Sequence, residues 1–148
     1  MTRPEQAYEN FKSGYNCCQS IAVAYADVLG LSREMAAQLS SGFGGGIGRL
    51  REVCGAVSGM VFVASAVKGY TDPTDNARKK ELYALVQKLA GAFEKENGSI
   101  VCRELLGLSV KKEEPTPSER TESYYKKRPC GELVLLAAEI LERELFME

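Results

Sequence analysis

Apolar residues recur along most of this chain at the spacing of about three to four residues that places them on one face of a helix. The alternation typical of half-buried strands is rare. Ala, Leu, Glu and Lys, which favour helices, dominate the periodic stretches. The pattern therefore predicts an all-α protein, a bundle of about six to eight helices.

Turn and capping residues divide this pattern into separate helices. Pro4 fits a first helical turn, Ser32 is a typical N-cap, and Asp72 with Pro73 would cap and begin the longest helix. The residues from Lys111 to Pro117 form a charged loop containing prolines. The expected helices cover residues 4–12, 16–29, 33–39, 54–67, 73–97, 99–106, 118–125 and 130–146.

Two segments depart from the amphipathic pattern. Residues 54–67 are apolar on nearly every side, which predicts a buried central helix, because such a helix must be covered all round. Residues 42–48 contain five glycines and are too glycine-dense for a stable helix. We expect a shaped loop there, with positive φ angles and close backbone approach.

Composition and charge narrow the cellular setting. A chain of 148 residues that is 45% hydrophobic can bury a core as one domain spanning residues 1–148. A net charge of -1 gives no field for nucleic acid or an anionic membrane, so neither partner is expected. The start is polar, and the apolar run from Val53 to Val67 is shorter than the ~20 residues that span a bilayer. We expect a cytoplasmic protein.

The chain has no histidine and five cysteines. The first fact excludes Ser-His and Cys-His nucleophiles and mixed Cys/His metal sites. In a reducing cytosol, cysteines indicate metal binding, catalysis or redox sensing more than a static disulfide framework. The candidate chemistry is therefore thiol chemistry.

Four of the cysteines, Cys17, Cys54, Cys102 and Cys130, each lie within about one turn of a predicted helix start. At such a position the helix dipole and free N–H groups favour the thiolate, so the pKa of the cysteine thiol can fall from about 8.5 to ~3.5–7.5. Thiolate is both the nucleophile and the metal ligand. Cys18 adjoins Cys17 but should face another side of the helix, as a packing residue or a second resolving thiol.

The segment Cys54-Gly55-Ala56-Val57-Ser58-Gly59, read as C-G-A-x-x-G, singles out one of the four. Its small residues allow another backbone or a ligand to approach Cys54 closely. Arg49 and Arg51 are nearby cations that would favour its thiolate. The first hypothesis is therefore a thiol redox protein that uses reversible disulfide or electron-transfer chemistry, such as a thiol–disulfide oxidoreductase in which Cys54 attacks and Cys17, Cys102 or Cys130 resolves the disulfide.

Two other interpretations stay open. The cysteines lack the paired spacing of zinc ribbons and of thioredoxin-like sites, but four thiolates from separate helices could hold zinc or an iron–sulfur cluster. Alternatively, the cysteines are packing residues of a helical interaction module. Such a module would form a homodimer through the apolar stripe of residues 82–93 or through the last helix.

The full set of motifs resembles a known family, the small redox-active proteins named for the pattern C-GCAxxG-C-C. The resemblance implies a helical domain in which Cys17, Cys54, Cys102 and Cys130 are the family's four cysteines, while Cys18 stands where the family has a small residue. Some relatives carry c-type haem, but this chain has no C-x-x-C-H, so no such haem is expected. The sequence identifies no other cofactor and no redox partner. The matching segments are Gly14-Tyr15-Asn16-Cys17, Phe43-Gly44-Gly45-Gly46-Ile47-Gly48, the C-G-A-x-x-G segment, Cys102-Arg103-Glu104-Leu105 and Cys130.

Overall fold

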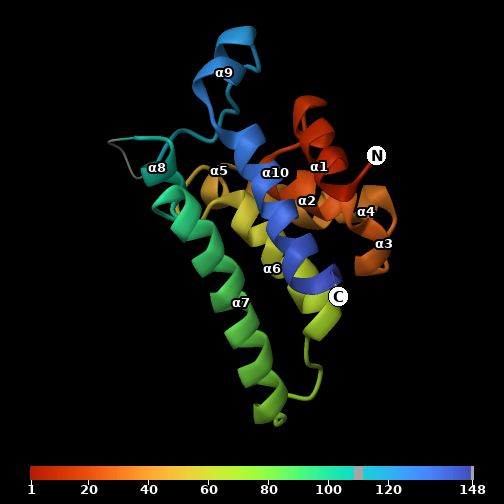
Figure 1. Cartoon of the computed structure of the whole chain (residues 1–148). Coiled ribbons are helices and arrows are strands. Elements are labelled where there is room, and N and C mark those ends of the chain that lie inside the picture. The colour runs from red at the N-terminus through yellow and green to blue at the C-terminus, as the bar shows by residue number, and fades with distance from the viewer. Residues whose placement is uncertain (109–111, 148) are drawn as a thin grey trace.

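The protein was analysed as a computed structural model that describes residues 1–108 and 112–147. Within these residues every regular element is a helix or a helical turn, which confirms the predicted all-α class (Figure 1). The elements are α1 (Arg3–Lys12), α2 (Cys17–Ala24), α3 (Ala26–Leu29), α4 (Arg33–Ser40), η1 (Ser41–Phe43), α5 (Gly44–Ile47), α6 (Gly55–Lys68), α7 (Asn76–Asn97), α8 (Cys102–Leu105), α9 (Glu122–Lys127), α10 (Cys130–Leu141) and η2 (Glu142–Phe146).

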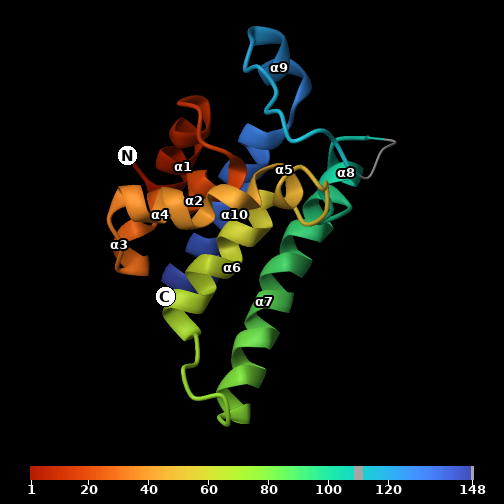
Figure 2. The same cartoon turned by 180° about the vertical axis from the view of Figure 1, so that it is seen from behind.

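Helix α6 is the central helix, as its uniformly apolar sequence predicted. It contacts α2, α7 and α10, and Figure 2 shows it running between α2 and α7. Ala56, Met60, Val63 and Ala64 on α6 are completely buried. The core of the molecule is therefore assembled around this helix.

The small residues of the C-G-A-x-x-G segment allow α2 to lie very close to α6. A Cβ atom added to Gly59 would lie 2.6 Å from the Cβ of Ile21, and one added to Gly55 would lie 3.0 Å from the Cβ of Cys17. Real Cβ atoms essentially never approach to under 3.0 Å. The sequence allowed either another backbone or a ligand to approach this segment, and the structure shows the close approach of another helix.

The apolar stripe of α7 faces the protein's own core. Leu82, Leu89 and Phe93 are buried there. The last helix behaves in the same way, because six of its twelve residues are buried. Neither stripe is a free apolar surface, so the predicted homodimer would need other contacts.

Three helix boundaries differ from the prediction. Helix α7 begins at Asn76, because the side chain of Asp75 accepts the N–H of Arg78, whereas Asp72 instead accepts hydrogen bonds from Thr74 in the preceding turn. The predicted helix 99–106 is reduced to α8. The predicted helix 118–125 begins later, at α9, because the hydroxyl of Thr121 accepts the N–H of Tyr124.

The predicted helix 16–29 is interrupted at Tyr25, which has φ -110° and ψ 21° and separates α2 from α3. Tyr25 is completely buried, and its hydroxyl donates to the carbonyl of Ala138 at 3.4 Å. The final helix does extend from Cys130 to Phe146, with its last turn wound more widely as η2. Lys111, the first residue of the predicted charged loop, lies outside the described residues.

The glycine segment forms short turns with the positive φ angles and close backbone approach that the sequence predicted. Gly45 and Gly46 within α5 have φ angles of 67° and 69°, which favour glycine. The turns are closed by backbone hydrogen bonds from Arg51 N to Gly45 O and from Glu52 N to Gly46 O, at 3.1 and 3.0 Å. This path returns the chain to the start of α6.

Candidate functional site: a cavity lined by four cysteines

The four predicted cysteines all stand at helix starts, and all four line one cavity of about 360 Å³. Cys17, Cys102 and Cys130 are the first residues of α2, α8 and α10, while Cys54 directly precedes α6. Cys18 is fully buried in the core and does not line the cavity. The structure thus brings together residues that are widely separated along the chain.

A short backbone ladder joins the segments that carry Cys54 and Cys102. Val53 and Val101 form an isolated antiparallel bridge. Cys54 N donates to Ile100 O at 2.8 Å, and Cys102 N donates to the carbonyl of Glu52. The bridge explains why α8 starts only at Cys102, because the residues before it are extended and pair with the chain leading into α6.

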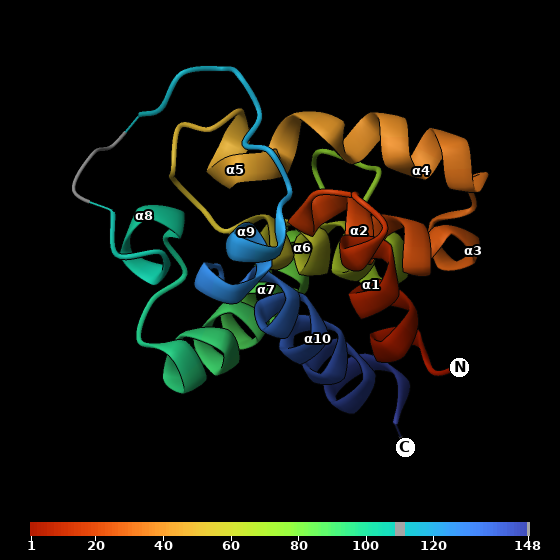
Figure 3. The same ribbon diagram turned by 90° about the horizontal axis from the view of Figure 1, so that it is seen from above.

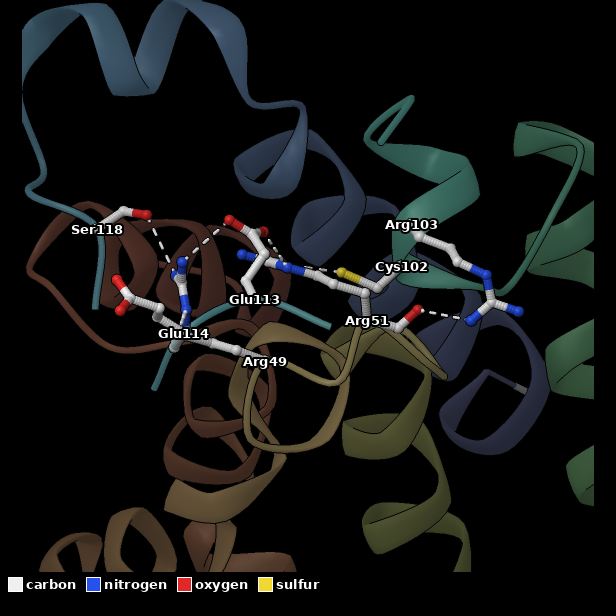
Figure 4. A network of polar contacts seen from close by, with 7 residues as sticks. All are labelled: Arg49, Arg51, Cys102, Arg103, Glu113, Glu114 and Ser118. Atoms are coloured by element: carbon white, nitrogen blue, oxygen red, sulfur yellow. Dashed lines mark hydrogen bonds and ion pairs between the residues drawn. The ribbon is translucent and has the colours of Figure 1, made fainter. Parts of the chain in front are cut away.

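The glycine turns serve Cys102 more directly than Cys54. A Cβ atom on Gly46 would lie 2.7 Å from the Cβ of Cys102, so only glycine permits this approach. Arg51 follows the turns, its side chain is 5% exposed, and its Nη1 donates to Cys102 Sγ at 3.4 Å (Figure 4). Arg51, predicted as a cation for Cys54, is therefore hydrogen-bonded to Cys102.

Glu113 connects two arginines at the edge of the cavity. Its carboxylate accepts hydrogen bonds from Arg51 Nε at 2.6 Å and from Arg49 Nη2 at 3.1 Å. Arg49 also donates to the carbonyl of Glu114 and to the hydroxyl of Ser118. These bonds attach the segment 112–121 to the glycine turns, which it crosses in the view from above (Figure 3). Sequence reasoning missed Glu113, because nothing in a charged loop marks its distant partner.

Cys17 and Cys130 form the pair whose thiols interact. The interaction between the two thiols is the main reason why the pKa of Cys130 is lowered to about 7 and that of Cys17 is raised well above its usual range. The charges of Arg128, Arg51 and Arg120 lower the pKa of Cys130 further. Both cysteines are only partly buried. Of the two, Cys130 is therefore the thiol that ionises first, and Cys17 stays protonated beside it.

The other cysteines are held as neutral thiols. Burial raises the pKa of Cys54 to about 12, although the N–H groups of Ala56 and Val57 at the start of α6 oppose the shift. Burial also raises the pKa of Cys102, against the opposing effect of Arg51, and raises that of Cys18 to about 12. A helix start alone therefore does not produce a thiolate in this protein.

Two further arginines and a tyrosine complete the cavity wall near Cys130. Arg128 and Arg120 lie over the ring of Tyr124, at 5.6 and 5.5 Å from its centroid. Arg120 also donates to the carbonyls of Phe11 and Tyr15 at 2.6 and 2.8 Å. Sequence reasoning missed all three residues, although Arg128 stands only two positions before Cys130 and could have been noticed for that reason.

The metal alternative can be tested on the geometry of the side chains. Within residues 1–108 and 112–147, no three or more Cys, Asp or Glu side chains are arranged so that they could hold a metal ion. The geometry thus gives no support to a zinc or iron–sulfur site, and that alternative stays a prediction. In the same part of the chain, no helix is both long and apolar enough to cross a membrane.

Comparison with known proteins gives one match. The model of a family described as "Putative redox-active protein (C_GCAxxG_C_C)" matches residues 15–144. This range includes all four cysteines of the cavity, the glycine turns and the C-G-A-x-x-G segment. No curated protein and no solved structure matches the chain significantly.

Proposed function

Because the chain belongs to the C_GCAxxG_C_C redox-active family, we propose that its cavity performs reversible thiol–disulfide chemistry with Cys130 as the attacking thiolate and Cys17 as the resolving thiol. The observation that carries this proposal is that Cys17 and Cys130, the first residues of α2 and α10, line one cavity together with Arg120 and Arg128. The interaction of the two thiols and the charges of the arginines lower the pKa of Cys130 to about 7. A thiol whose pKa lies near the ambient pH combines a useful thiolate fraction with good nucleophilicity.

The raised pKa of Cys17 fits the second step. It results mainly from the interaction with Cys130 and from the burial of the Cys17 thiol. Once Cys130 has entered a mixed disulfide, its negative charge is gone, and the pKa of Cys17 falls towards its ordinary value. Cys17 can then lose its proton to solvent and attack Cys130 Sγ, which forms the Cys17–Cys130 disulfide and releases the second half of the substrate as a thiolate.

Cys54, the attacking thiol predicted from the sequence, receives less support. It is 4% exposed, and its pKa is raised to about 12. We assign Cys54 and Cys102 a supporting role in the cavity wall. The proposal also places the protein in a reducing compartment such as the cytosol, where a reactive thiol pair is returned to its reduced form.

The experiment is mapping of the disulfide formed by limited oxidation with diamide, which takes two electrons and two protons from a pair of thiols. After the protein has been reduced and then oxidised, we expect a Cys17–Cys130 disulfide, identified by peptide mass spectrometry. Cys130→Ser should abolish it. Cys18→Ala, a matched control in the core next to Cys17, should leave it in place. A disulfide between Cys54 and Cys102, or unchanged oxidation of Cys130→Ser, would overturn the assignment.

A further inference from the structure

The charge of the cavity wall is strongly one-sided. Four arginines line the cavity together with the four cysteines, and the described lining residues include no aspartate or glutamate. The arginines are Arg49, Arg51, Arg120 and Arg128.

The charges of Arg49 and Arg51 are partly offset by Glu113, which bonds to both. The charges of the other two guanidinium groups are not offset in this way. Arg120 donates to the carbonyls of Phe11 and Tyr15, which are neutral acceptors. Within the described residues Arg128 forms no ion pair and rests on the ring of Tyr124. A net positive field therefore remains on the side of the cavity that holds Cys130.

We propose that this cavity binds a low-molecular-weight anionic disulfide, with a carboxylate of the substrate on Arg128 and the reacting sulfur at Cys130. The inference rests on the proposed function and adds to it the class of substrate. A guanidinium recognises a carboxylate through two parallel N–H donors, and such bonds are stronger than those between neutral groups.

The dimensions of the site favour a small molecule over a protein disulfide. The volume of about 360 Å³ lies within the range of ~300–1,000 Å³ that is usual for small-molecule pockets. Cys54 and Cys102 are buried, and Cys17 and Cys130 are only partly exposed. A disulfide fixed in the surface of another protein would need more exposed thiols than these.

The reaction balances without a further reactant. The Cys130 thiolate attacks one sulfur of the substrate, so that a mixed disulfide forms and the first substrate thiolate leaves. Cys17 loses its proton to solvent and attacks Cys130 Sγ, and the second substrate thiolate leaves. The substrate disulfide gains two electrons, and the Cys17–Cys130 pair loses them. Each protein molecule thus reduces one substrate disulfide in a single turnover.

The test compares three disulfides of similar size and different charge in single-turnover reactions with the reduced protein. These are 3,3′-dithiodipropionate with two negative charges, bis(2-hydroxyethyl) disulfide without charge, and cystamine with two positive charges. Each rate is divided by the rate of the same disulfide with 2-mercaptoethanol, which removes differences in intrinsic reactivity. We expect the normalised rate for the dianion to exceed that for the neutral compound by about tenfold, as one charged hydrogen-bonded contact allows, with cystamine slowest.

Arg128→Gln tests the anchoring residue. If Arg128 binds the substrate carboxylate, this substitution removes most of the preference for the dianion over the neutral compound. If Arg128 instead acts only by lowering the pKa of Cys130, its replacement slows all three reactions together and the preference for the dianion persists. That result would overturn the assignment of Arg128 as the anchoring residue. The matched control is Arg33→Gln, which removes the same charge from an exposed position on α4 outside the cavity.

A binding experiment tests the anion site without any redox step. Suberate has the length and charges of 3,3′-dithiodipropionate but no sulfur, and it should bind to Cys130→Ser in calorimetry, more weakly after Arg128→Gln is added and at high salt. Equal normalised rates for the three disulfides, or no suberate binding, would overturn the inference while a Cys17–Cys130 disulfide formed by diamide would still support the proposed function. Suberate binding without that disulfide would identify an anion site and reject the thiol chemistry.

Discussion

The two pairs of cysteines in the cavity share a position at helix starts but differ in their surroundings. Cys17 and Cys130 are partly exposed, and their mutual interaction and the arginines near them lower the pKa of Cys130. Cys54 and Cys102 are buried, joined through a backbone bridge, and have raised pKa values. The helix dipole acts on both pairs, so burial and neighbouring charges decide which thiol ionises.

The largest expected difference between the two pairs is in the reactivity of their thiols. At pH 7 about half of Cys130 would be thiolate, whereas Cys54, with a pKa of about 12, would be almost wholly protonated. Even though a more basic thiolate is the better nucleophile, Cys130 should react with iodoacetamide at least ~100 times faster than Cys54. Isotope-coded alkylation followed by peptide mass spectrometry measures both rates in one sample.

The alkylation rate of Cys130 should change with pH in one direction only. As the pH falls through about 7, the Cys130 thiolate becomes protonated and its alkylation slows, approaching tenfold per pH unit below that value. Cys17→Ala removes the thiol whose interaction stabilises the thiolate, so the midpoint should move up towards the ordinary cysteine pKa of about 8.5. If Cys54 reacts first, or if Cys17→Ala leaves the midpoint in place, the difference between the two pairs is not the one described.

Local sequence signals were enough to place the cysteines at helix starts. Asn16 caps α2 with Gln19 in a capping box, Gly98 in the left-handed conformation ends α7, and both are readable from neighbouring residues. The same kind of signal failed where two candidates compete within a few residues. Asp72 and Asp75 are both suitable caps, and the surrounding sequence does not decide between them.

The ranking of the cysteines could not be predicted, because it depends on contacts between distant parts of the chain. Arg51 stands near Cys54 in the sequence, but the bridge between Val53 and Val101 brings Cys102 to its guanidinium. The interaction between Cys17 and Cys130 joins residues from opposite ends of the chain in one cavity. A motif identifies which residues belong to the site, and packing decides which of them is charged.

A third prediction concerns the close contact beside Cys102. Gly46→Ala would place a Cβ 2.7 Å from the Cβ of Cys102 and 2.8 Å from the N of Glu52, at a φ of 69° that disfavours side chains. We expect it to lower the free energy of unfolding by about 3 kcal/mol, from backbone strain and overpacking together. Urea titration followed by circular dichroism measures the loss.

Gly98→Ala is the matched control for that substitution. Gly98 also has a positive φ, of 84°, but nothing lies within 4 Å of its added Cβ. It should therefore show only the strain, about 1 kcal/mol. Equal losses in the two variants would mean that the region around Cys102 tolerates an added methyl group and is not tightly packed.

The smallest expected effect concerns backbone strain in the chain that leads to Cys54. Ile47 has a φ of 69°, which is costly for a β-branched residue, and it is 39% exposed and belongs to neither hydrophobic core cluster. Relief of strain worth ~1–2 kcal/mol should outweigh the ~0.5–1 kcal/mol lost through the greater freedom of glycine in the unfolded chain. Ile47→Gly is thus expected to stabilise the protein by about 0.5 kcal/mol, visible as a small rise in the thermal midpoint.

Leu50→Gly is the control, because Leu50 is 42% exposed and is not among the residues with positive φ, so the same replacement should lower the midpoint. If both variants are destabilised equally, the positive φ of Ile47 carries no strain, and the Cys17–Cys130 and Cys54–Cys102 pairs differ only in burial and charge.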